Sequence, residues 1–126
     1  MAEVVGQRLI ESGFEQTLTS VLDLPHRASG PGRLEIGPPQ RFRNRTVVAL
    51  LWEPAGPDGL LPVMDGLIEL HHAPQGCTSV ILWARYDLPL GRSEDLVDRL
   101  VAHRVAESAA DEILSLISAP AVAPLR

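Results

Sequence analysis

The chain has 126 residues, of which 45% are hydrophobic and 21% are charged, and its formal net charge is −5. This length favours a single domain, and the apolar fraction is enough for a real core, which excludes a disordered chain. The mildly acidic balance disfavours nucleic acid as a partner. All 11 basic residues are arginines, so Schiff-base chemistry and a phosphate-loop lysine are both excluded.

Cysteine usage and the start of the chain bear on the compartment. The only cysteine, Cys77, excludes an intrachain disulfide and a thiolate metal cluster. The first residues lack the apolar segment of a signal peptide, and no apolar run approaches the roughly 20 residues that span a bilayer. We therefore expect a cytoplasmic protein without a membrane span.

Residues 1–32 form an N-terminal part whose structure the sequence leaves open. Its apolar residues fall loosely at helical spacing, but Gly6 and Gly13 interrupt them. Residues 14–24 also alternate well enough to be a strand. Residues 33–37 fit a short strand, which is followed by two prolines.

Residues 43–88 predict a meander of antiparallel strands. Residues 43–53 are rich in β-branched and large apolar side chains and end at a proline and glycine cluster, which is typical of a strand and its turn. A second strand enters through Val63, and a third covers residues 77–88. The short links between them favour antiparallel pairing. The third strand places one set of side chains on one face and the other set on the opposite face: Val80, Leu82, Ala84 and Tyr86 against Ile81, Trp83 and Arg85.

Residues 93–118 predict one long C-terminal helix. Ser93 suits the N-cap, and the acidic residues after it suit the positive end of the helix dipole. The apolar residues follow a single i,i+4 line: Val97, Val101, Val105, Ala109, Ile113 and Ile117. This line rotates by about 40° per step, so we expect the buried face to turn as the helix crosses a twisted sheet. The predicted fold class is α+β, a curved antiparallel β-sheet with a long C-terminal α-helix.

Short motifs stand in a defined order between residues 45 and 118. They are Trp52-Glu53 before a turn, Pro62-Val63 with Asp65 after it, Tyr86 with Pro89-Leu90-Gly91, and Asp98 with His103-Arg104-Val105-Ala106-Glu107. Together they resemble the START-like superfamily, also called SRPBCC or helix-grip proteins, and within it a bacterial polyketide cyclase-like branch of unknown function. The resemblance implies a curved sheet that grips the helix around a cavity for a lipid, sterol, polyketide or other apolar ligand. A few members catalyse cyclisation or dehydration.

The N-terminus departs from the pattern that this resemblance implies. The full fold usually opens with a strand and two short helices, and residues 1–32 fit that unit poorly. We therefore expect a shortened or atypical N-terminus in which the first strand is missing or replaced. An open sheet edge would then favour a homodimer in which a second subunit covers it.

The candidate ligand-binding residues are Trp52, Trp83, Tyr86, Val97, Val101 and Arg104. The three aromatic side chains either line a pocket or pack in the core. Arg104 either points under the sheet, to hold a ligand carboxylate or phenol, or faces solvent. His103 is a weak candidate for a general base, because Glu107 lies beside it at i,i+4; the alternative is a polar surface pair.

Metal and cofactor sites are not indicated. His71 and His72 are neighbours in a predicted strand, so they point to opposite faces and do not chelate one ion. The sequence has no nucleophilic serine, dinucleotide or phosphate-loop motif. It therefore predicts binding of a small hydrophobic or amphipathic ligand between sheet and helix. The alternatives are a polyketide cyclase or dehydratase-like enzyme and a structural or interaction protein with a collapsed cavity.

Overall fold

The computed structural model describes residues 2–27, 32–54, 63–86 and 96–118, with side chains from residue 100 onward in the last range. Its strands are β1 (Ala2–Ile10), β2 (Arg33–Ile36), β3 (Gln40–Arg41), β4 (Thr46–Glu53), β5 (Met64–His72) and β6 (Thr78–Tyr86). Its helices are α1 (Phe14–Leu22), α2 (Leu24–Arg27), the 3-10 turn η1 (Pro74–Gly76) and α3 (Leu96–Ser118).

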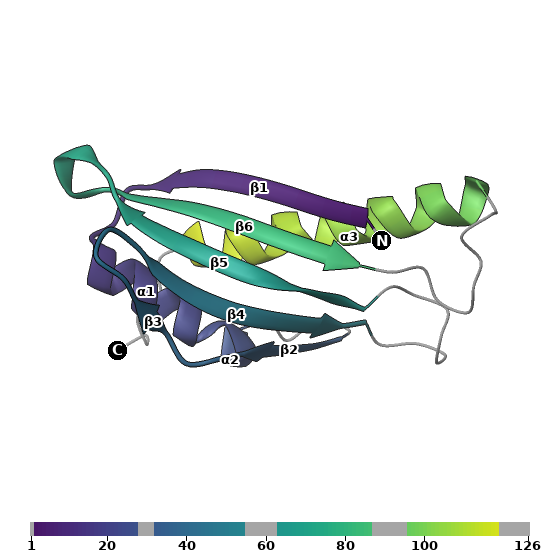
Figure 1. Cartoon of the computed structure of the whole chain (residues 1–126), viewed down its shortest axis with the longest axis horizontal. Coiled ribbons are helices and arrows are strands. Elements are labelled where there is room, and N and C mark those ends of the chain that lie inside the picture. The colour runs from purple at the N-terminus through teal and green to yellow at the C-terminus, as the bar shows by residue number, and fades with distance from the viewer. Residues whose placement is uncertain (1, 28–31, 55–62, 87–95, 119–126) are drawn as a thin grey trace, which may run out of the picture.

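Within these residues, six strands form one antiparallel sheet in the order β1-β6-β5-β4-β2, with β3 also paired to β4. Figure 1 shows α1, α2 and α3 on the same face of this curved sheet. The long helix α3 packs on β1 and β6, while α1 packs on β5 and against α3. The core lies between the sheet and this helical layer, so the predicted arrangement of a curved sheet and a long C-terminal helix is confirmed.

The predicted meander corresponds to β4, β5 and β6. The alternation in β6 is confirmed. The even-numbered residues from Val80 to Tyr86 are buried, while Trp83 and Arg85 on the other face are exposed. The tight turn at Pro74–Gly76 joins β5 to β6, with Gln75 at a φ of 62°. The short strand predicted from Arg33 is β2. The turn that follows Pro54 falls outside the described residues.

The expectation that the first strand is missing or replaced is wrong. β1 pairs with β6 along its whole length, from Ala2 opposite Tyr86 to Ile10 opposite Thr78. Residues 14–22, which also fitted a strand, form the helix α1. With α1 and α2 after β1, the chain contains the opening strand and the short helices that the resemblance implies.

The strand pattern of β1 is obscured because α3 packs directly on two of its inward positions. At Gly6, a Cβ would lie 2.5 Å from Leu114 Cδ1, so the leucine fills the place of a side chain. At Arg8, the guanidinium crosses to the helix, with Nη2 2.8 Å from Asp111 Oδ1 and Nη1 3.1 Å from Ser115 Oγ. An inward glycine and an inward arginine therefore replace the apolar residues that would have marked a half-buried strand.

The buried face of α3 differs from the predicted line at its start. Val101 is 53% exposed, whereas the buried residues are Ala102, Ala106, Ala109, Ala110, Ile113, Leu114 and Ile117. Spacings of three and four residues keep this stripe in phase with the helix period, so it turns less than a strict i,i+4 line. Small alanines at the contact also let the helix approach the sheet closely. Ser93 and the side chain of Val97 lie outside the described residues.

Among the helices that the structure describes, none combines the length and the apolar character that a membrane crossing requires.

Candidate functional site

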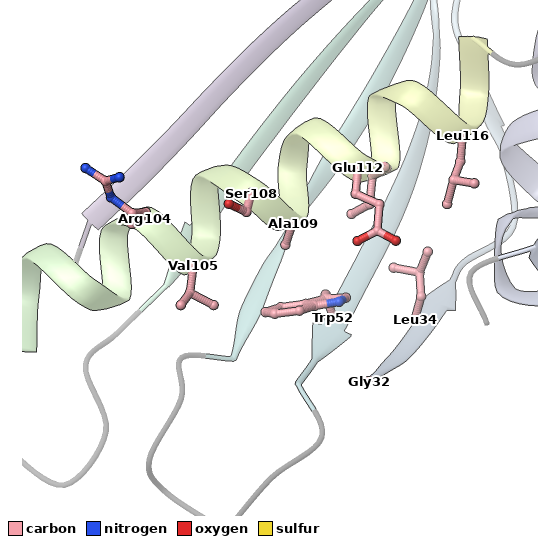
Figure 2. A pocket seen from close by; sticks show the side chains of 10 residues that line it. Gly32, Leu34, Trp52, Arg104, Val105, Ser108, Ala109, Glu112 and Leu116 are labelled. Atoms are coloured by element: carbon pink, nitrogen blue, oxygen red, sulfur yellow. The ribbon is translucent and has the colours of Figure 1, made fainter. Parts of the chain in front are cut away.

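A hollow of about 290 Å³ lies between α3 and the part of the sheet formed by β4 and β2. Figure 2 shows its lining side chains. The apolar part of the lining is Leu34, Trp52, Val105, Ala109, Ile113 and Leu116, and the rest is Gly32, Arg104, Ser108 and Glu112. Ligand sites typically begin at about 300 Å³, so this hollow lies at the lower end of that size range.

The sheet side of the hollow is made by Trp52 and Leu34, which face each other in the register of β4 and β2. The even-numbered residues of β4 point toward the helices, as the burial of Val48 and Leu50 shows. This parity places Trp52 on the inner face of the sheet, where it packs against the core and forms a wall of the hollow.

Gly32 keeps the rim beside Trp52 open. A Cβ at this residue would lie 3.5 Å from Trp52 Nε1 and 3.0 Å from the backbone oxygen of Glu53. The φ of 133° also falls where L-residues with a side chain are rare. A residue with a side chain would therefore be strained here and would contact the Glu53 oxygen tightly, while its contact with the indole would be an ordinary one.

The helix side of the hollow comes from two rows of α3 at i,i+4 spacing. One row is Val105, Ala109 and Ile113, and the other is Arg104, Ser108, Glu112 and Leu116. In Figure 2 the carboxylate of Glu112 extends toward the side where Trp52 and Leu34 lie, whereas the guanidinium of Arg104 extends away from them. Arg104 therefore borders the hollow without pointing under the sheet, and Glu112 is a lining residue that the sequence did not single out.

Trp83, a predicted ligand-binding residue, lies on the opposite face of the sheet and is 45% exposed. The pairing register places it in one apolar row with Val5, Leu67 and Ala49. It cannot line a cavity under the helices, because odd-numbered residues of β6 point outward. Val101 does not line the hollow either, and the side chain of Val97 is outside the described residues.

Tyr86 and His103 form a separate polar contact near the start of the described side chains of α3. The tyrosine is only 4% exposed, and its hydroxyl is hydrogen-bonded to His103 Nδ1 at 2.6 Å. On the other side of the ring, Nε2 lies 3.7 Å from Glu107 Oε2. If the ring carries its proton on Nε2, that N–H points toward Glu107. The unprotonated Nδ1 then accepts a hydrogen bond from the hydroxyl of Tyr86. Neither residue lines the hollow, so His103 is not placed as a general base for a ligand bound there.

The buried hydroxyl makes a prediction about alkaline pH. Burial raises the pKa of Tyr86, and the negative charge of Glu107 raises that pKa further. Because the folded pKa of Tyr86 exceeds the unfolded value of about 10, the contribution of its neutral hydroxyl to folding stability is fully present below about pH 10. This contribution is lost as the pH rises through the folded pKa. Tyr86 is the only tyrosine and the chain has no lysine. We expect its tyrosinate absorbance to appear at higher pH in the native protein than in concentrated urea.

Tyr86→Phe serves as the control for this titration, since it should remove the part of the alkaline destabilisation that belongs to the hydroxyl. Coincident absorbance curves for native and urea-unfolded protein would contradict the prediction.

The adjacent histidines behave as the strand geometry predicts. The ring of His72 stacks on Phe14 of α1, with centroids 4.3 Å apart. On the other face, His71 Nε2 lies 3.1 Å from Glu69 Oε1. Within the described ranges, no group of three or more histidine, cysteine or acidic residues is arranged to hold a metal ion.

No family model matches the chain, and no curated protein sequence matches it. Several solved structures do match this chain. TTHA0849 from Thermus thermophilus superposes with a TM-score of 0.51 at 17% identity, over 93% of this chain and 94% of that one. Ara h 8.0201 gives a TM-score of 0.58 at 11% identity, over 93% and 95%.

The ZhuI aromatase/cyclase from Streptomyces sp. R1128 gives a TM-score of 0.53 at 11% identity, over 91% of this chain and 87% of that one. At these identities the likeness shows the fold alone, and each match spans nearly the whole chain. The helix-grip fold that the sequence motifs implied is thereby confirmed.

Proposed function

We propose that this helix-grip chain of the START-like type binds a small apolar or amphipathic molecule in the hollow between α3 and the β4–β2 part of the sheet. The observation that carries the proposal is the wall formed by Trp52, opposite aliphatic side chains of α3, around about 290 Å³ of space. Each Å² of apolar ligand surface that this wall removes from water contributes about 25 cal/mol. An indole wall adds a large, rigid contact area at little cost in side-chain entropy.

Both tryptophans of the chain take part in the test, because they lie on opposite faces of the sheet. Trp83→Phe leaves Trp52 as the only indole emitter, and Trp52→Phe leaves Trp83 as the matched control. The probe is a neutral long-chain alcohol with a terminal bromine, called the bromoalcohol below. Its bromine quenches indole emission on contact. We expect saturable quenching in Trp83→Phe and only weak, linear quenching in Trp52→Phe. Equal quenching in both variants, or none in either, would refute binding in this hollow.

A cyclase or dehydratase activity is the second function that the sequence raised. One structural neighbour is named an aromatase/cyclase, but the fold alone is shared at 11% identity. The base that such chemistry would need was His103, and this residue is hydrogen-bonded to Tyr86 instead of lining the hollow. The geometry therefore favours binding over this reaction.

The homodimer remains a prediction. It rested on an open edge left by a missing first strand, and β1 occupies that place. Native mass spectrometry of freshly purified protein would show the oligomeric state and any co-purified lipid in one experiment. An apo monomer that takes up no bromoalcohol would favour the alternative of a structural protein with a filled cavity.

A further inference from the structure

The two charged side chains that line the hollow under α3 extend in different directions. They are Arg104 and Glu112, eight positions apart on the helix. Figure 2 shows the carboxylate of Glu112 on the side of Trp52, and the guanidinium of Arg104 directed away from it. The charge that a bound molecule would meet beside the indole is therefore negative.

The carboxylate of Glu112 is available for a ligand. Within the part of the chain that the structure describes, no side chain forms an ion pair or hydrogen bond with it. Two arginines of the strands are paired elsewhere: Arg33 Nη2 lies 2.7 Å from Glu53 Oε1, and Arg8 Nη2 lies 2.8 Å from Asp111 Oδ1. Neither cation neutralises the hollow.

Trp52 supplies a second group that attracts positive charge. Figure 2 shows its indole nearly edge-on, with one face turned toward α3. The negative face of an indole is the best aromatic partner for a cation. A carboxylate and an indole face, with aliphatic walls around them, form a site suited to an ammonium group on an apolar body.

We propose that this hollow selects cationic amphiphiles, with an ammonium group between Glu112 and Trp52, over anionic ones of the same length. The inference rests on the proposed function, because it names the class of ligand for the same hollow. The apolar body would lie against Leu34 and Ile113, which line the hollow and belong to opposite walls. Arg104, the residue that would have favoured a carboxylate, is turned away.

The test compares three probes of equal chain length: dodecylammonium, dodecanol and dodecanoate. Each displaces the bromoalcohol from Trp83→Phe protein, with recovery of Trp52 emission as the readout, below its micelle concentration and at low salt. We expect dodecylammonium to bind about five- to tenfold more tightly than dodecanoate, a modest factor because Glu112 is exposed. Added salt should reduce this ratio.

Two variants with the same change in net charge separate the hollow from the acidic surface as a whole. Glu112→Gln should bring the ammonium-to-carboxylate ratio close to one, whereas Glu107→Gln, five positions away on α3 and outside the lining, should leave it unchanged. An unchanged ratio in Glu112→Gln, or tighter binding of dodecanoate than of dodecylammonium in the parent protein, would overturn the inference. Failure of neutral dodecanol to displace the bromoalcohol would overturn the proposed function itself, and the inference with it.

Discussion

Gly66→Ala is expected to lower the free energy of unfolding by about 3 kcal/mol, a large effect for a single methyl group. Gly66 lies within β5, opposite Leu50 of β4 and Ala84 of β6. A Cβ at this position would overlap the backbone oxygen of Trp83 and would lie 2.7 Å from the Cα of Ala84. The obstacles are backbone atoms of the next strand, so the methyl group fits only if β5 and β6 separate and their hydrogen bonds weaken.

Urea unfolding followed by circular dichroism measures this effect, which should appear as a lower midpoint at an unchanged slope. Gly37→Ala is the matched control, because its Cβ would lie 3.6 Å from the Cβ of Ala49, an ordinary contact. At such a site alanine stabilises by about 0.4–1 kcal/mol through the unfolded chain. Equal stabilities of the two variants would show that the strands near Gly66 adapt without cost, against our expectation.

Ala109→Leu is expected to weaken binding of the bromoalcohol by at least about tenfold, with a smaller loss of stability than the same change at Ala106. Ala109 lines the hollow, so a longer side chain extends into space that the probe would occupy. A loss of about 60 Å² of apolar contact corresponds to about 1.5 kcal/mol, which is a factor of about ten in affinity. Contact quenching of Trp52 in the Trp83→Phe background measures the affinity.

Ala106→Leu provides the contrast to this variant. Ala106 is on the same helix but fully buried, and it does not line the hollow. Added carbon atoms in a packed core cost about 1–3 kcal/mol, so this variant should lose stability. Normal probe binding by a folded Ala109→Leu variant would mean that the probe binds elsewhere.

The elements that the sequence predicted well are those whose pattern has a single physical origin. In β6 one face is buried and the other is exposed, so Leu82 and Trp83 alternate with the period of a strand. The C-terminal part of α3 shows the same agreement, because Ile113 and Ile117 face the core at helical spacing. β1 was missed since its inward positions include Gly6 and Arg8. These two residues fit there because they contact side chains of α3, more than a hundred residues along the chain.

The candidate site was predictable only in part. The structure places Trp52 in the wall of the hollow, but the residue pattern of β4 does not say which face of the sheet is covered. Trp83 and Tyr86 differ in parity, so alternation alone already placed them on opposite faces and only one of them could face the helices. Glu112 carries no signal in the sequence that separates it from any other acidic residue on an exposed helix face.

The sequence by itself determined the strands of the meander, their alternation and the last residue of the long helix, because these depend on neighbours within a few positions. The tertiary structure decided which face of the sheet became the inside. That choice depends on where α1, α2 and α3 pack, and therefore on contacts between residues that are far apart along the chain. The docking of α3 placed Trp52 in a hollow and Trp83 on the outer surface, and it brought Glu112 rather than Arg104 to the side of the indole.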